Sequence, residues 1–122
     1  MYNYINLDYL KILAYGDNSF VLKTIRSFIQ ELNLALGKMQ GQIADKKWND
    51  LYITAHSIRP NVNLMGMKTI EVMIKYIENS ASTGSNLDRL YAVFNQIKNA
   101  EESILAELEE EIKSLNYAAS ER

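Results

Sequence analysis

Apolar residues recur along this chain at the spacing of amphipathic helices. Intervals of three and four residues place side chains on one face of a helix. One such stripe comprises Val21, Ile25, Phe28, Leu32, Leu36, Met39 and Ile43. A second stripe comprises Trp48, Leu51, Ala55, Ile58, Val62 and Met65. Residues 19–44 and the segment that follows them are therefore predicted to form two long helices, each with one face in a core.

Three further helices are predicted around these two. They cover about residues 7–15, 68–79 and 87–115. The segment between the last two helices, Ser-Ala-Ser-Thr-Gly-Ser at 80–85, has the composition of a loop. Residues 116–122 are predicted to be a frayed tail.

Polar residues mark where the helices are expected to begin, because Asn, Asp and Ser are favoured at the N-cap. The expected caps are Asn6 for the first helix, Asp17 or Asn18 for the second and Asp45 for the third. Gly66 stands where the third helix is expected to end. Four amphipathic helices with short connections pack most simply as an antiparallel bundle. The sequence thus predicts an all-α fold, an antiparallel four-helix bundle with an additional short N-terminal helix.

Composition narrows the class of protein. A chain of 122 residues is expected to form a single domain over 1–122. With 13 Lys and Arg against 15 Asp and Glu, it lacks the basic surface of a nucleic-acid-binding protein. It has no cysteine and one histidine, too few ligands for a protein-bound zinc. Without a signal-peptide pattern or an apolar run that could span a membrane, we expect a soluble cytoplasmic protein with no membrane partner.

The single histidine, His56, is the first candidate for chemistry. Helical geometry places it about 100° round from Ala55 and therefore off the core stripe. The single proline, Pro60, removes the hydrogen bond to the carbonyl four residues back, which belongs to His56. Local strain of this kind often accompanies a site. The alternatives are an incidental histidine on the rim of the bundle, or a third helix that kinks or ends near Arg59.

Around this histidine the sequence resembles a known signature. Residues 55–66 read Ala-His-Ser-Ile-Arg-Pro-Asn-Val-Asn-Leu-Met-Gly. They resemble the motif of histidine-containing phosphotransfer (HPt) domains, Ala-His-x-Leu-Lys-Gly-Ser followed by a glycine ten residues after the histidine. The matching positions are Ala55, His56, Ile58 and Gly66. The departures are Arg59 for lysine, Pro60 for glycine and Asn61 for a small residue.

The resemblance implies a phosphoryl carrier rather than an independent enzyme. Such a protein relays a phosphoryl group between aspartates of receiver domains in a two-component His–Asp phosphorelay, with His56 as the phosphoacceptor. Its partners are response-regulator receiver domains and hybrid sensor kinases. It needs no cofactor or metal of its own, because Mg²⁺ belongs to the receiver. Pro60 and Gly66 would set the backbone geometry of the site.

Neighbouring side chains are assigned roles from their spacing. Arg59, one turn from His56, is placed to stabilise the charge of the phosphoryl group. Asn63 could hydrogen-bond the imidazole or a phosphoryl oxygen. A shallow apolar docking patch for the partner is expected from Tyr52, Ile53 and Leu64.

Two charged groups are expected to be ordinary solvated surface. The first is the acidic run Glu107, Glu109, Glu110 and Glu111 on the last helix. The second, at most a small positive patch near the site, comprises Lys46, Lys47, Arg59 and Lys68. Because Pro60 departs from the HPt motif, a second interpretation stays open: a non-catalytic docking or scaffold protein with an HPt-like fold, in which His56 is incidental.

Overall fold

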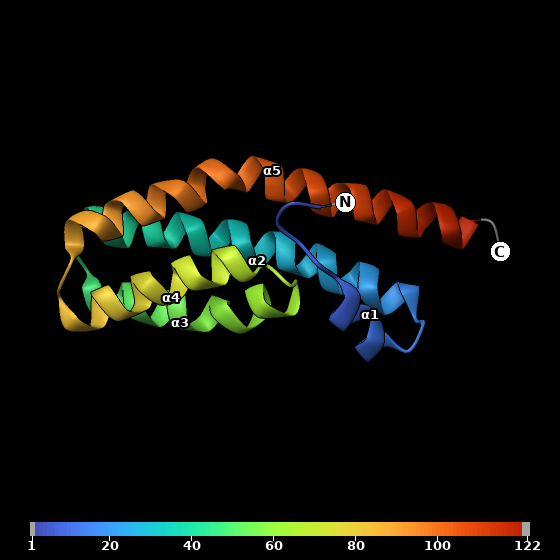
Figure 1. Ribbon diagram of the computed structural model, residues 1–122, viewed down its shortest axis with the longest axis horizontal. Coiled ribbons are helices and arrows are strands. Elements are labelled where there is room, and N and C mark those ends of the chain that lie inside the picture. The colour runs from blue at the N-terminus through green and yellow to red at the C-terminus, as the bar shows by residue number, and fades with distance from the viewer. Residues whose placement is uncertain (1, 121–122) are drawn as a thin grey trace.

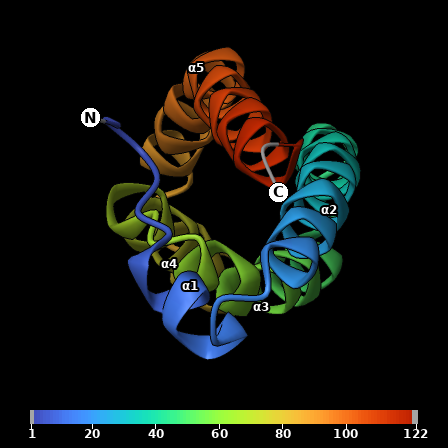
Figure 2. The same cartoon turned by 90° about the vertical axis from the view of Figure 1, so that its right-hand side faces the viewer.

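The computed structural model describes residues 2–120, with side chains described as far as residue 117. These residues form five helices and no strand: α1 (Asp8–Ala14), α2 (Asn18–Ala44), α3 (Trp48–Leu64), α4 (Lys68–Thr83) and α5 (Leu87–Ser120). The helices α2, α3, α4 and α5 form a bundle around one core, and each packs against the next around the ring (Figure 1, Figure 2). The prediction of an all-α fold is confirmed.

The predicted apolar stripes form the core of the bundle. Every residue of the α2 stripe is buried, as is every residue of the α3 stripe except the half-buried Trp48. From α4 and α5 the core receives Ile70, Ile74, Ile77, Leu90, Phe94, Ile97, Ile104, Leu108 and Leu115. Burial of these side chains removes apolar surface from water and is the main source of stability. None of the described helices combines the length and apolar character needed to cross a membrane.

The two long helices α2 and α5 extend past α3 and α4, and the N-terminal part of the chain covers this overhang (Figure 1). We call residues 2–7 the N-terminal strap. Its Asn6 donates a backbone hydrogen bond to the carbonyl of Met65 at 3.0 Å. Gly66 has a φ of +66°, and a Cβ at this position would lie 2.1 Å from the Asn6 carbonyl oxygen. Gly66 therefore both ends α3 and lets the strap pass close to the backbone.

The strap is fastened to α5 by Glu107. The carboxylate of Glu107 accepts hydrogen bonds from the backbone N–H groups of Asn3, Tyr4 and Ile5, at 3.0, 2.9 and 3.1 Å. The three donors and their acceptor are more than 100 residues apart in sequence. The expectation that this acidic run is only solvated surface is wrong for Glu107, because the run faces a segment of irregular backbone whose donors need a partner.

Glu111, one turn further along α5, is buried and completes the fastening. It accepts a hydrogen bond from the Tyr2 hydroxyl at 2.8 Å and forms an ion pair with Lys11 of α1. The pKa of Tyr2 is raised to about 12, mainly by burial and to a smaller extent by the hydrogen bond to Glu111. The prediction that the acidic run is solvated surface is therefore wrong for Glu111 too.

The boundary between α4 and α5 differs from the prediction. The loop predicted for residues 80–85 is helical as far as Thr83. The hydroxyl groups of Ser82 and Thr83 donate to the carbonyl of Asn79, which satisfies an acceptor in the last turn. Gly84, with a φ of +69°, then ends the helix. Hydroxyl-rich composition predicts a loop, but these side chains bond the helix's own backbone.

The other differences concern the helix ends. α5 is helical to Ser120, past the end predicted at residue 115, and residues 121–122 of the predicted tail lie outside the described residues. Asp45 ends α2 and does not cap α3, because Lys46 has a φ of +56° and Lys47 occupies the N-cap.

Two N-cap predictions can be compared directly with the structure. Asp17 is the N-cap of α2, and its side chain accepts a hydrogen bond from the backbone N–H of Phe20 at 3.1 Å. At α1 the N-cap is Leu7 rather than Asn6. The Asn6 side chain nonetheless accepts from the backbone N–H of Asp8 at 3.0 Å. Asn6 therefore supplies an acceptor to the first turn of α1, but from the position before the N-cap and not from the N-cap itself.

Candidate functional site

His56 lies in the middle of α3, with its side chain 57% exposed. The neighbouring core residues Ala55 and Ile58 are buried. α3 is a single helix through Pro60 and does not end near Arg59. Because proline has no N–H, the carbonyl of His56 lacks the helical donor that residue 60 would otherwise supply. The imidazole is thus presented to solvent from a helix that the core holds in place.

A buried glutamate of α4 contacts the imidazole. Nδ1 of His56 lies 2.7 Å from Oε1 of Glu78, whose residue is only 6% exposed. Glu78 follows four residues after Ile74, so it lies on the apolar face that packs against α3. Glu78 is not among the site residues predicted from the sequence. Its spacing from Ile74 and Ile77 places Glu78 at the border of the buried stripe, but Glu71, seven residues earlier, shares this border, so the spacing alone does not single out Glu78.

The contact with Glu78 decides which imidazole nitrogen faces solvent. A carboxylate offers only acceptors, so the proton of a neutral His56 belongs on Nδ1, which donates to Glu78. The other nitrogen, Nε2, then carries the lone pair. This tautomer is assigned from the hydrogen bond. A solvent-facing imidazole nitrogen with a free lone pair is a nucleophile.

Arg59 lies beside the same carboxylate. Its Nε is 3.4 Å from Oε2 of Glu78, and its side chain is 28% exposed. Oε2 is buried and has no hydrogen-bond partner among the described residues. The guanidinium therefore balances the buried charge without being fully occupied by it. A planar group with five donors in this position can also bind an oxyanion next to His56.

The ring of Tyr52 stacks on the ring of His56. The ring centroids are 5.8 Å apart, and the ring planes differ by 15°. Tyr52 is half-buried and packs against the core, whereas the next residue, Ile53, is 52% exposed. Tyr52 therefore contacts the imidazole of His56, whereas the side chain of Ile53 is exposed to solvent.

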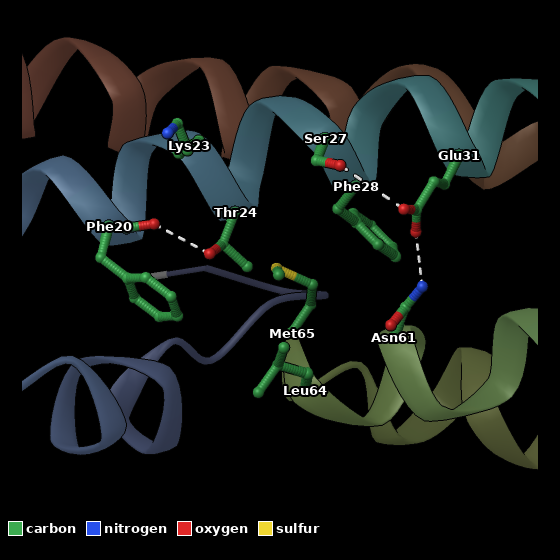
Figure 3. A pocket seen from close by; sticks show the side chains of 9 residues that line it. All are labelled: Phe20, Lys23, Thr24, Ser27, Phe28, Glu31, Asn61, Leu64 and Met65. Atoms are coloured by element: carbon green, nitrogen blue, oxygen red, sulfur yellow. Dashed lines mark hydrogen bonds between the residues drawn. The ribbon is translucent and has the colours of Figure 1, made fainter.

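Leu64, the third residue predicted for docking, lies apart from these two. It lines a hollow of about 260 Å³ between α2 and the end of α3 (Figure 3). Phe20 and Met65 line the same hollow, and Asn61 donates to Glu31 at its edge. Eight residues of helix, about 12 Å, separate Leu64 from His56 along the axis of α3.

A second hollow, of about 360 Å³, is closer to His56. It runs between α2 and α3, and the side chains of Leu34 and Ile53 on its border are 62% and 52% exposed. Ser57, the residue after His56, also lines it. Ile53 thus lines a hollow on the side of α3 that faces α2, whereas His56 contacts Glu78 of α4, and the three residues predicted for docking do not form one patch.

Asn63 and the predicted basic patch are not assembled at His56. Asn63 donates to the carboxylate of Glu71 at 3.0 and 3.2 Å and, among the described residues, forms no hydrogen bond with the imidazole. Lys46 and Lys47 precede α3, while Lys68 follows it. These lysines lie at opposite ends of the helix and form no common patch.

No family model, curated protein or solved structure matched this chain. Among the described residues, no group of three or more His, Cys, Asp or Glu is arranged to hold a metal ion. The chemistry available at this face is that of one exposed imidazole, one buried carboxylate and one guanidinium.

Proposed function

We propose that this protein is a histidine phosphotransfer protein that relays a phosphoryl group between aspartates of receiver domains. In this proposal α2 to α5 form an antiparallel four-helix bundle of the HPt type, with α1 as the additional short helix. The contact between Nδ1 of His56 and Glu78 carries the proposal. It accounts for a nucleophilic Nε2 on an exposed ring, which is what a phosphoryl donor on another protein requires.

The transfer step needs only groups that two proteins supply together. The Nε2 lone pair of His56 attacks the phosphorus of an aspartyl phosphate, and the new N–P bond forms as the P–O bond to the aspartyl carboxylate breaks. The carboxylate leaves with the electron pair. The proton on Nδ1 stays hydrogen-bonded to Glu78, whose charge stabilises the ring as it becomes cationic. The return step is the reverse, onto a second receiver.

Two further features support this assignment. Arg59 is close enough to Glu78 to be held near the ring, and its remaining donors can neutralise phosphoryl oxygens. The exposed side chain of Ile53, three residues before His56 on α3, suits a contact in a small, rapidly released interface with a receiver or hybrid kinase. Mg²⁺ would come with the receiver. The absence of cysteine suits a cytoplasmic location.

Incubation with phosphorylated receiver domains tests the proposal. The wild-type chain is expected to take up acid-labile phosphate that maps to His56. His56→Gln is expected to take up none while it keeps its helical circular dichroism, because the side chain is mostly exposed. Absence of labelling across several receivers would favour the scaffold function, and undiminished labelling of His56→Gln would exclude His56 as the acceptor.

A further inference from the structure

A single hydrogen bond does not fix an imidazole. The Glu78 contact holds Nδ1 of His56 at one point, 2.7 Å from Oε1, but leaves the ring free to swing about that contact. A second contact on the face of the ring removes this freedom. Tyr52 supplies it, since the two rings lie nearly parallel at a centroid distance of 5.8 Å.

We propose that Tyr52 is a positioning residue that holds the imidazole of His56 in the orientation required for phosphoryl acceptance. This inference rests on the phosphotransfer function proposed above. Tyr52 precedes His56 by four residues on α3, so the two side chains project from the same face of one helix. Glu78 fixes the ring at its edge and Tyr52 fixes it at its face.

Tyr52 is itself held firmly enough to act in this way. Its side chain is half-buried and packs against the core cluster, and α3 is anchored by buried residues on either side, Leu51 and Ala55. Among the described residues the Tyr52 hydroxyl makes no hydrogen bond. The contribution of Tyr52 therefore comes from the ring face, which phenylalanine also offers and leucine does not.

The orientation of the ring decides where the lone pair points. Nucleophilic attack requires the reacting atoms to be aligned, and a ring that swings spends less time in the reactive orientation. Loss of the stack is therefore expected to slow phosphorylation of His56 whatever the donor is. A small donor isolates this effect from docking of a partner protein.

The test uses phosphoramidate as donor and three variants of the whole chain: Tyr52→Leu, Tyr52→Phe and, as a matched control, Tyr9→Leu on the exposed surface of α1. In this reaction the N–P bond to His56 forms as the P–N bond of the donor breaks, and ammonia leaves with a proton. Tyr52→Leu is expected to react about 3-fold to 10-fold more slowly than wild type. Tyr52→Phe and Tyr9→Leu are expected to stay within about 2-fold.

Proton NMR of the chain's single histidine supplies a readout that does not depend on transfer. The ring protons of His56 are expected to shift upfield through the ring current in wild type and Tyr52→Phe, and to lose this shift in Tyr52→Leu. Loss of the shift with an unchanged phosphorylation rate would overturn the positioning role and leave the phosphotransfer function standing. A wild-type chain that accepts phosphate from neither phosphoramidate nor any receiver would overturn both.

Discussion

Two carboxylates of this small protein leave solvent for different reasons. Glu107 binds three backbone N–H groups of the strap, and Glu78 binds the side chain of His56. Backbone amides do not titrate and have no other function to serve, so Glu107 acts as a latch. The imidazole reaches solvent and has a second nitrogen that can act as a nucleophile. The identity of the donor therefore distinguishes a structural carboxylate from one at a candidate site.

The two carboxylates also differ in how completely they are satisfied. Both oxygens of Glu107 accept hydrogen bonds, whereas Oε2 of Glu78 has only the ion pair with Nε of Arg59, at 3.4 Å. A buried carboxylate is costly to desolvate, and donors or cations beside it offset that cost. Glu78 is therefore held by two side chains of α3, whereas Glu107 is held by the backbone of the strap.

The largest expected effect is the loss of phosphoryl acceptance in Glu78→Gln. This variant tests whether Glu78, unlike Glu107, acts on His56. An amide can turn its NH₂ group toward Nδ1, which favours the tautomer with the proton on Nε2 and removes the nucleophile. Phosphoryl acceptance should fall by about 10-fold to 100-fold, by analogy with the loss seen when the hydrogen-bond partner of a metal-ligating histidine is removed. Labelling by a phosphorylated receiver measures this. Glu71→Gln, on the same helix but bonded to Asn63, should keep the wild-type rate.

Glu107→Gln is expected to lower the free energy of unfolding and to leave phosphoryl acceptance unchanged. The amide oxygen can still accept from Tyr4 and Ile5, but the NH₂ group then faces the N–H of Asn3, donor against donor. The free energy of unfolding should fall by about 1–3 kcal/mol, as when a charged acceptor is lost. Chemical denaturation measures it, with exposed Glu109→Gln as the control. Equal loss of phosphoryl acceptance in Glu107→Gln would contradict the separation of latch from site.

The smallest expected effect concerns the hydrogen bond between Tyr2 of the strap and Glu111. Its contribution to the free energy of unfolding should depend on alkaline pH. Below pH 10 Tyr2 is protonated in the folded and unfolded states alike. Between pH 10 and about 12 the unfolded state loses this proton first, because folding raises the pKa of Tyr2, and stability falls as pH rises. Tyr2→Phe should lose this component. The difference between the two denaturation curves isolates it from lysine titration, and Tyr15→Phe, at a 95% exposed position, is the control.

The positions of the helices and the exposure of His56 follow from the local pattern of the sequence. Intervals of three and four residues identify the buried faces of α2 and α3, because helical geometry is a property of the local backbone. The same geometry places His56 off the stripe, and the structure finds it exposed. Helix ends were less well predicted, since Asp45 and the segment 80–85 carry residues that suit a cap or a loop as well as the last turn of a helix.

Which side chains meet depends on how the helices pack in three dimensions. Glu78 lies 22 residues from His56, and Glu107 lies more than 100 residues from the strap. Periodicity shows which face of a helix is buried but not which neighbour covers it. An acidic residue near a buried stripe is therefore indistinguishable in sequence from a solvated one. The partners of Glu78 and Glu107 are set by the order in which the helices pack around the core, because a carboxylate leaves water only where packing brings donors to it.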